Sequence, residues 1–289
     1  MTMARRTSNA LSRSLVVSAD DTLVFGEEQI AFQRKDGRGE RHVESLGANH
    51  RETKLHDAIR GGSEEATIVA LKLDKCRAFH FHDTSATARV RQHGEVHDNL
   101  SLHDDAGNLA AVLYKYKQQE AKSAVYWRIL KTLQQIAPWL EDLVIEPTEL
   151  NENVIALRWR ERDSDIVFGP HMASDGTLRA MALVTLLLQP MEKLPSLMVI
   201  DEPELGLHPF ALDAITGLLR AASVHCQVVV ATQSPRLVDL CEPEDVVVVE
   251  RDGGESTFVR EGAEKLHDWL EEYSLGELWE KNVIGGGPV

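Results

Sequence analysis

The stretch SLMVIDEPELGLHP (Ser196–Pro209) joins a short apolar run to two adjacent acids, Asp201 and Glu202. A solidly apolar run is typical of a strand in a parallel sheet, and ligands bind at the carboxyl edge of such sheets. Asp201 is therefore a candidate ligand of Mg²⁺, and Glu202 a candidate for orienting or deprotonating a water molecule. Pro209 is predicted to open the next helix. The alternative interpretation is a pair of solvated acids at a strand end.

Two further apolar runs follow, QVVVAT (227–232) and DVVVVE (245–250). Between Thr177 and Asp252 such runs alternate with helical patterns, which predicts a parallel sheet covered by helices on both faces. The second run ends in Thr232, Gln233, Ser234 and Pro235. A polar side chain at Gln233 is a candidate sensor of a γ-phosphate or of its attacking water, and a plain strand-to-helix turn is the alternative.

The stretch ASDGTLRAMALVTLLL (173–188) predicts a helix that is apolar nearly all round and therefore buried. Ser174 and Gly176 stand at its start, where backbone N–H groups and a hydroxyl can meet an anion. The alternative is an ordinary N-cap formed by Ser174 or Asp175.

Outside these three stretches, the sequence patterns indicate the structure less specifically. We expect a disordered start over residues 1–13, an antiparallel β-layer over 14–66, an insertion of helices and strands over 67–170, and the core with the acidic pair over 171–289. Within the insertion, a helical stretch is predicted over 108–140 and a strand over 153–162. His80 and His82, with Asp83, are either metal ligands or a polar strand face.

The composition limits the classes of partner and the compartment. A formal net charge of −15 disfavours non-specific binding to nucleic acid or to an anionic membrane. The three scattered cysteines favour a reducing cytoplasm over a disulfide framework. No apolar run is long enough to span a membrane.

Together these stretches resemble the C-terminal half of ABC-type ATPase heads. The chain is similar to AAA family ATPases of the RecF/SMC/OLD-like group, and most of all to small bacterial members without long arms that are linked to DNA repair or phage defence. The resemblance makes SDGTLR the signature motif, LMVIDEPE the Walker B motif and TQSP the switch loop. It makes the following residues the D-loop: Leu205, Gly206, Leu207 and His208.

The resemblance implies an α/β P-loop NTPase head that binds ATP and Mg²⁺. Two heads would sandwich ATP, so that Ser174 and Gly176 of one chain contact the nucleotide of the other. The output would be ATP-dependent dimerisation, with DNA or an effector protein as a further partner.

Two departures from the family pattern stand out. Gln233 occupies the switch position, which usually holds His. The phosphate-binding loop GxxxxGK[ST] is absent, since none of the 19 glycines is followed by lysine. We therefore expect an N-terminally truncated head that is inactive alone and that pairs with an intact or complementary ATPase half. The alternative is a non-catalytic regulatory or dimerisation module that acts in trans.

Overall fold

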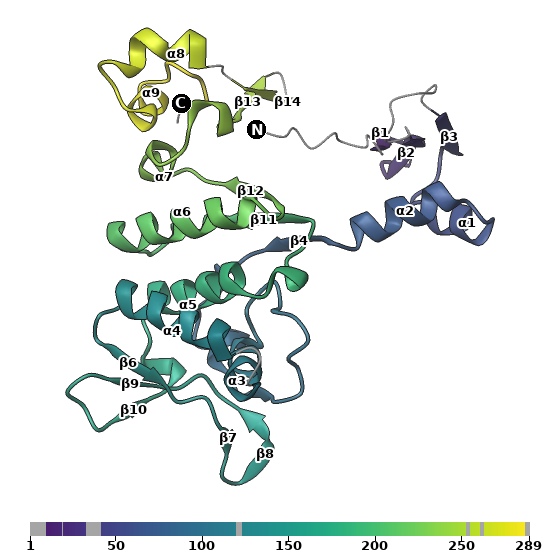
Figure 1. The fold of residues 1–289 in the computed structure, drawn as a ribbon. Coiled ribbons are helices and arrows are strands. Elements are labelled where there is room, and N and C mark those ends of the chain that lie inside the picture. The colour runs from purple at the N-terminus through teal and green to yellow at the C-terminus, as the bar shows by residue number, and fades with distance from the viewer. Residues whose placement is uncertain are drawn as a thin grey trace. The chain divides into compact units, whose positions relative to one another are not determined.

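A computed structural model describes residues 10–18, 20–32, 42–119, 123–252, 255–260 and 263–286. The chain divides into two compact units, Met1–Cys76 and Arg77–Val289 (Figure 1). The boundary predicted at residue 170 falls inside the second unit. Of the start expected to be disordered, residues 1–9 lie outside the described residues, whereas Ala10–Arg13 form the beginning of a strand, which corrects that expectation.

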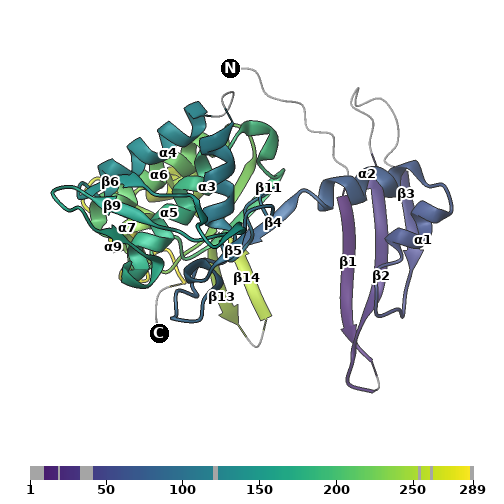
Figure 2. The same cartoon turned by 90° about the horizontal axis from the view of Figure 1, so that it is seen from below.

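The first unit is built on an antiparallel sheet, as its alternating sequence predicted. The sheet has the order β1-β2-β3 (Figure 2). Its elements are β1 (Ala10–Val17), β2 (Leu23–Phe32), β3 (His42–Gly47), α1 (Leu55–Arg60) and α2 (Glu64–Leu73). A small core joins the helices to β2, and its buried members are Ile30, Leu55, Ala66 and Val69.

A buried carboxylate, Glu28, lies two residues before Ile30 on β2 and joins β1 and the start of α1 to this strand. Its side chain is fully buried and accepts hydrogen bonds from Arg13 Nε at 2.9 Å, Thr53 Oγ1 at 2.6 Å and the Lys54 amide at 2.8 Å. Burial raises the pKa of Glu28, but these hydrogen bonds outweigh it, and the pKa lies below its ordinary value of 4.5. The ion is therefore stabilised in the folded unit.

The second unit contains a parallel sheet with the order β12-β11-β4. Strands β11 (Leu197–Asp201) and β12 (Gln227–Ala231) run parallel, which confirms the prediction for these two apolar runs. The third strand is β4 (Cys76–Phe79), which no sequence pattern indicated. The prediction for DVVVVE was wrong, because β13 (Val248–Asp252) pairs antiparallel with β14 (Glu255–Val259) in a separate sheet. The two strands are adjacent in the sequence and pair as neighbours, so this run does not cross over to the parallel sheet.

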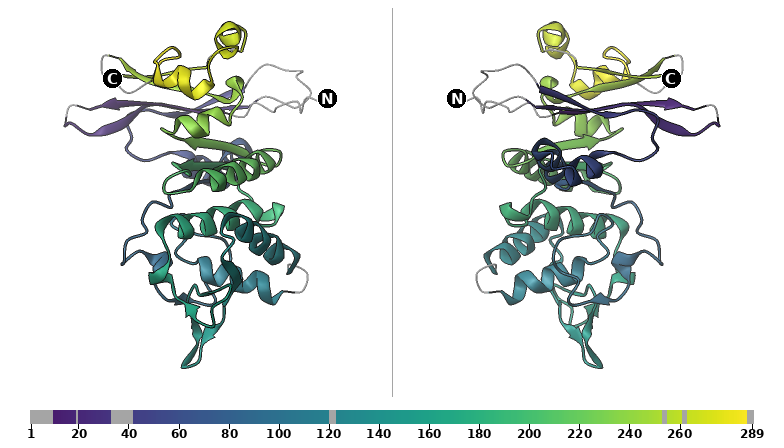
Figure 3. Two further views of the ribbon diagram at one scale, coloured as in Figure 1. Left: turned by 90° about the vertical axis from the view of Figure 1, so that its left-hand side faces the viewer. Right: turned by 90° about the vertical axis from the view of Figure 1, so that its right-hand side faces the viewer.

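Helices cover one face of the parallel sheet. Helices α5 (Asp175–Leu188) and α6 (Pro209–Ser223) run side by side, and they pack in the core that contains Met198 and Ile200 (Figure 1, Figure 3). The opposite face was also expected to be covered, and this was wrong for the described residues. There Val199 is half-buried and its cross-strand partner Val229 is 43% exposed.

A lobe of helices and short strands lies between β4 and α5 in the sequence. Its helices are α3 (Leu109–Gln118) and α4 (Ser123–Ile136), which divide the predicted helical stretch in two. The strand predicted over 153–162 is also two strands, because residues 156–158 lead from one small sheet to another. The lobe's strands are β5 (Gly94–Glu95), β6 (Leu140–Leu143), β7 (Pro147–Thr148), β8 (Asn151–Ile155), β9 (Trp159–Glu161) and β10 (Val167–Phe168).

The C-terminal part forms its own small core. It consists of α7 (Pro235–Asp239), the β13–β14 hairpin, α8 (Ala263–Leu270) and α9 (Leu275–Glu280). Helix α9 packs on α7, and a Cβ atom at Gly276 would lie 2.4 Å from the Pro235 carbonyl oxygen. This tail is thereby attached to the helix that follows the TQSP turn. None of the described helices is long and apolar enough to cross a membrane.

Candidate functional site

The candidate site lies at the carboxyl edge of the parallel sheet in the second unit. Asp201 is the last residue of β11 and pairs with Ala231, the last residue of β12. The Glu202 amide extends the ladder by donating to the Ala231 carbonyl at 2.8 Å. Because the two strands end in register, Glu202 and Gln233 leave the sheet at the same edge. Gln233 is exposed, as a side chain that meets a ligand must be.

The backbone turns sharply after Asp201. Glu202 has a φ of 39° and Gly206 has a φ of 74°, so both lie in the left-handed region that favours glycine. The Leu205 amide donates to the Glu202 carbonyl at 3.2 Å, and the Leu207 amide donates to the Glu204 carbonyl at 2.9 Å. A non-glycine residue in this region is strained, and such strain is frequent at functional sites.

Two histidines flank Asp201 from the segment that follows β4. Both lie beyond the strand end, which corrects their placement on a strand face. His82 Nε2 lies 3.0 Å from the Asp201 carbonyl oxygen, and His80 Nδ1 lies 3.8 Å from Asp201 Oδ2. Within the described part of the chain, no three His, Cys, Asp or Glu side chains are grouped to hold a metal ion. The zinc hypothesis for His80, His82 and Asp83 therefore finds no support.

The start of α5 shows the N-cap that was the alternative interpretation of Ser174. Ser174 Oγ accepts a hydrogen bond from the Thr177 amide at 3.1 Å, and the residue is exposed. Next to it, hydrogen bonds from Thr84 and Arg91, together with the Arg91 charge, hold the pKa of Asp175 below its usual value. An N-cap and an anion contact are compatible, because the hydroxyl still faces solvent.

Buried Arg91 holds the segment that leads into α5, residues 170–175. Its guanidinium donates to the carbonyls of Thr84 at 2.7 Å and Ala173 at 3.0 Å, to the Pro170 carbonyl, and to Asp175 Oδ1 at 2.8 Å. The position of Ser174 is therefore set by a side chain more than 80 residues away in the sequence. No sequence pattern indicated this role, because it depends on long-range packing.

Gly176 has a packing role that the sequence did not predict. A Cβ atom there would lie 2.1 Å from the Gly206 carbonyl oxygen, so only glycine allows the helix and the loop to touch. The structure thus brings together two residues that were predicted separately, one in the signature stretch and one in the D-loop.

We expect Gly176→Ala to destabilise the second unit by ~1–3 kcal/mol, since a backbone oxygen must move to admit the methyl group. Gly217 in α6 is the matched control, because a Cβ atom there meets nothing within 4 Å. Gly217→Ala should stabilise by ~0.5–1 kcal/mol through helix propensity. Thermal unfolding of both variants would check this, and an equal upward shift in Tm would contradict the contact.

The remaining D-loop residues surround this contact. Leu205 and His208 are exposed, and Leu207 is half-buried against the main core. His208 is the N-cap of α6, and its Nδ1 accepts a hydrogen bond from the Phe210 amide at 3.3 Å. Pro209 opens α6 as predicted.

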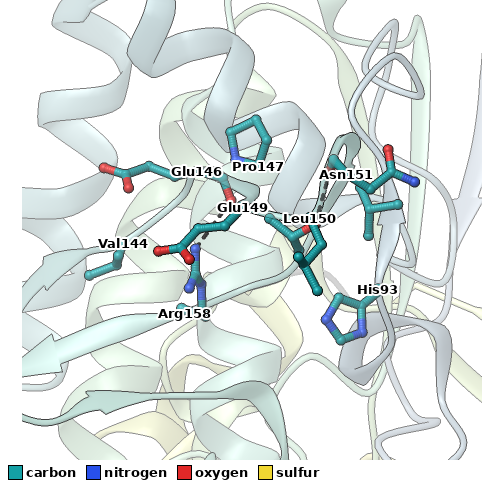
Figure 4. Close-up of a pocket in the computed structure, with 10 residues that line it drawn as sticks. His93, Val144, Glu146, Pro147, Glu149, Leu150, Asn151 and Arg158 are labelled. Atoms are coloured by element: carbon teal, nitrogen blue, oxygen red, sulfur yellow. Dashed lines mark hydrogen bonds between the residues drawn. The ribbon is translucent and has the colours of Figure 1, made fainter.

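A cavity of about 560 Å³ lies away from this edge, beside the β7–β8 hairpin (Figure 4). None of the predicted site residues lines it, and its walls mix apolar with polar and charged side chains. It is lined by His93, Val144, Glu146, Pro147, Thr148, Glu149, Leu150, Asn151, Val154 and Arg158.

The parallel strands, the acids at their carboxyl ends and the buried helix that begins at Ser174 are the arrangement expected of an AAA-type ATPase domain. Within that class, the chain belongs to the family described as AAA domain, putative AbiEii toxin, Type IV TA system. The family model matches residues 15–239, which include every predicted site residue. A search of curated proteins found no match.

Solved SMC heads are among the similar structures. One is an SMC head bound to the C-winged helix domain of ScpA, with 13% identity, 86% of this chain and 71% of that chain covered, and a TM-score of 0.48. Another is the SMC head domain from Thermotoga maritima, with 14% identity, coverage of 88% and 74%, and a TM-score of 0.41.

Proposed function

We propose that this chain is the part of an ATP-hydrolysing head that carries the magnesium ligand, the water-activating acid and the signature serine. The observation that carries the proposal is the register of β11 and β12, which delivers Asp201, Glu202 and Gln233 to one sheet edge. Asp201 binds Mg²⁺, Glu202 orients or deprotonates the attacking water, and Gln233 hydrogen-bonds the γ-phosphate.

The donor set at this edge fits Mg²⁺. The ion takes one or two carboxylates and keeps several waters, and the Asp201 side chain is 39% exposed. Bound Mg²⁺ would neutralise charge on the phosphates, which the acids alone would repel. Glu202 is half-buried beside the buried Pro203, which supports its role toward a water near the phosphate.

The groups that bind the phosphates must come from a segment outside these 289 residues, since the 289 residues contain no GxxxxGK[ST]. Three features support a complementary ATPase half as the partner. Val229 exposes apolar surface on a parallel sheet, which is normally covered on both faces. Within the described sheet, β12 is an edge strand. Glu204 Oε2 is buried and has no hydrogen-bond donor among the described residues.

We further propose that two heads sandwich ATP, with Ser174 and Gly176 facing the nucleotide of the partner. The setting is DNA repair or phage defence, with DNA or an effector protein as the target. A second candidate is a non-catalytic module that offers the same residues in trans to an intact ATPase. The missing phosphate loop favours this candidate, which predicts no turnover even when the loop is supplied on the same chain.

Ser174→Arg should abolish ATP-dependent dimerisation without unfolding the head. The residue is exposed, so the longer side chain is tolerated in the monomer but occupies the space for the partner's γ-phosphate. Light scattering with and without Mg·ATP, on the chain with its phosphate loop supplied, would measure the effect. Dimers of unchanged strength would contradict the sandwich.

The test of the function uses isothermal titration with Mg·ATP and phosphate release. The 289-residue chain should bind ATP weakly or not at all, because most phosphate contacts come from the loop and its lysine. Addition of the first strand, loop and helix of an SMC head should give both binding and turnover. Micromolar binding and steady turnover by the 289-residue chain alone would mean that the nucleotide site lies elsewhere.

A further inference from the structure

A single side chain, Arg179, connects helix α5 to two loops, the one that follows Glu202 and the one that contains His82 beside Asp201. Its Nε donates to the Phe81 carbonyl at 3.0 Å, and its Nη2 donates to the His82 carbonyl at 2.9 Å and to Thr84 Oγ1 at 3.4 Å. Its Nη1 donates to the Leu205 carbonyl at 3.0 Å. Arg179 and these four acceptor atoms are called the Arg179 clasp below.

The first loop of the clasp leads directly to Asp201. His82 presents its carbonyl to Arg179 while its ring Nε2 lies 3.0 Å from the Asp201 carbonyl oxygen. The second loop leads to Glu202, because the Leu205 amide donates to the Glu202 carbonyl while the Leu205 carbonyl accepts from Arg179. Each candidate acid is therefore two hydrogen bonds from the same guanidinium.

The clasp is closely packed around the start of α5. A Cβ atom at Gly206 would lie 2.8 Å from Arg179 Nη1, and one at Gly176 would lie 2.1 Å from the Gly206 oxygen. Arg179 stands five residues after Ser174 on the same helix. A movement of the helix start therefore cannot occur without moving the turn that follows Glu202.

We propose that Arg179 is a positioning residue, which couples the helix start at Ser174 to the placement of Asp201 and Glu202. The role needs the planar guanidinium, since its fork reaches two loops at once and a lysine ammonium cannot reproduce that geometry. All four acceptors are uncharged, so geometry rather than charge pairing carries the coupling. The effect on hydrolysis rests on the function proposed above, whereas the coupling itself does not.

Amide hydrogen exchange on the 289-residue chain tests the clasp without ATP. Arg179→Lys should speed exchange roughly tenfold at residues 202–208, as expected for one lost hydrogen bond. The matched control is Arg158→Lys, because Arg158 also donates to a carbonyl, that of Glu146 at 3.3 Å, but at the distant cavity. Unchanged exchange at 202–208 in Arg179→Lys overturns the proposal. If that variant does not fold, Arg179→Gln keeps two donors and serves in its place.

A double-mutant comparison separates coupling from plain stabilisation. Ser174→Ala removes the N-cap and should also speed exchange at 202–208 in the wild-type background. In the Arg179→Lys background, Ser174→Ala should speed exchange at 202–208 little further, because the hydrogen bonds that link the helix start to this loop are already lost. Fully additive effects overturn the coupling.

Turnover in the chain with the added SMC segment completes the test. Arg179→Lys should lower kcat at least about tenfold, where kcat is expressed per ATP site counted by titration. The KM for ATP should change by no more than about twofold, because the clasp positions the acids and not the nucleotide. Unchanged kcat overturns the positioning role. Absence of turnover in the wild-type chain with the segment would instead contradict the proposed ATPase, and the exchange experiments would still decide the clasp.

Discussion

Glu202→Gln should lower ATP turnover ~10²–10⁴-fold while ATP binding is retained, when the phosphate loop is supplied by the added SMC segment. Glutamine has nearly the shape of glutamate, so the strained turn at a φ of 39° is kept. It cannot accept a proton from water, and this removes the step assigned to the carboxylate. Phosphate release measures turnover, and isothermal titration measures binding.

The matched control for this variant is Glu192→Gln. Glu192 is exposed in the short turn after α5, and it loses the same charge in the same unit. Turnover of this control should equal that of the wild type. If Glu202→Gln also turned over at the wild-type rate, Glu202 would have no part in the chemistry.

Glu28→Ala should destabilise the first unit by ~2–4 kcal/mol, because each buried donor left without an acceptor typically costs ~1–3 kcal/mol and the partly exposed Arg13 can turn to solvent. Three donors that now meet the carboxylate would lose their acceptor, namely Arg13 Nε, Thr53 Oγ1 and the Lys54 amide. Exchange of the β2 and β3 amides reports on this unit alone, which matters because a chain of two units need not unfold in one step.

The control is its neighbour Glu27, which is exposed on the other face of β2. Glu27→Ala should change the stability by no more than ~0.5 kcal/mol. Equal effects of the two substitutions would show that the Glu28 network contributes nothing specific.

The Glu28 network also sets the expected pH dependence of the first unit. The folded pKa lies below the ordinary value of 4.5, so the contribution is fully present above that value. It is lost as the pH falls through the lowered folded pKa. Glu28→Ala should accordingly remove part of the acid sensitivity of β2 and β3 exchange.

Local patterns were sufficient for the elements that carry the acids. The runs that became β11 and β12 are short, apolar and bounded by turn residues, and their parallel pairing follows from the helix between them. The start of α5 at Ser174 and of α6 at Pro209 could be predicted for a similar reason, since an N-cap and an N1 proline act on their own turn.

The same patterns were insufficient where an apolar strand could pair either in the parallel sheet or in a hairpin. DVVVVE reads like a third parallel strand, yet β13 pairs with β14 in a hairpin. The third strand of the parallel sheet is instead β4, which lies more than 100 residues before β11 in the sequence. Which partner a strand takes depends on the path of the whole chain.

The sequence by itself determined which residues end the parallel strands and begin the buried helix, because strand and helix signals act over a few residues. Only the tertiary structure decided what surrounds them: His82 against Asp201, Gly176 against Gly206, and the Arg179 clasp across both loops. These contacts join residues up to 119 positions apart. Close approach of that kind is set by packing, and packing leaves no periodic signal in the chain.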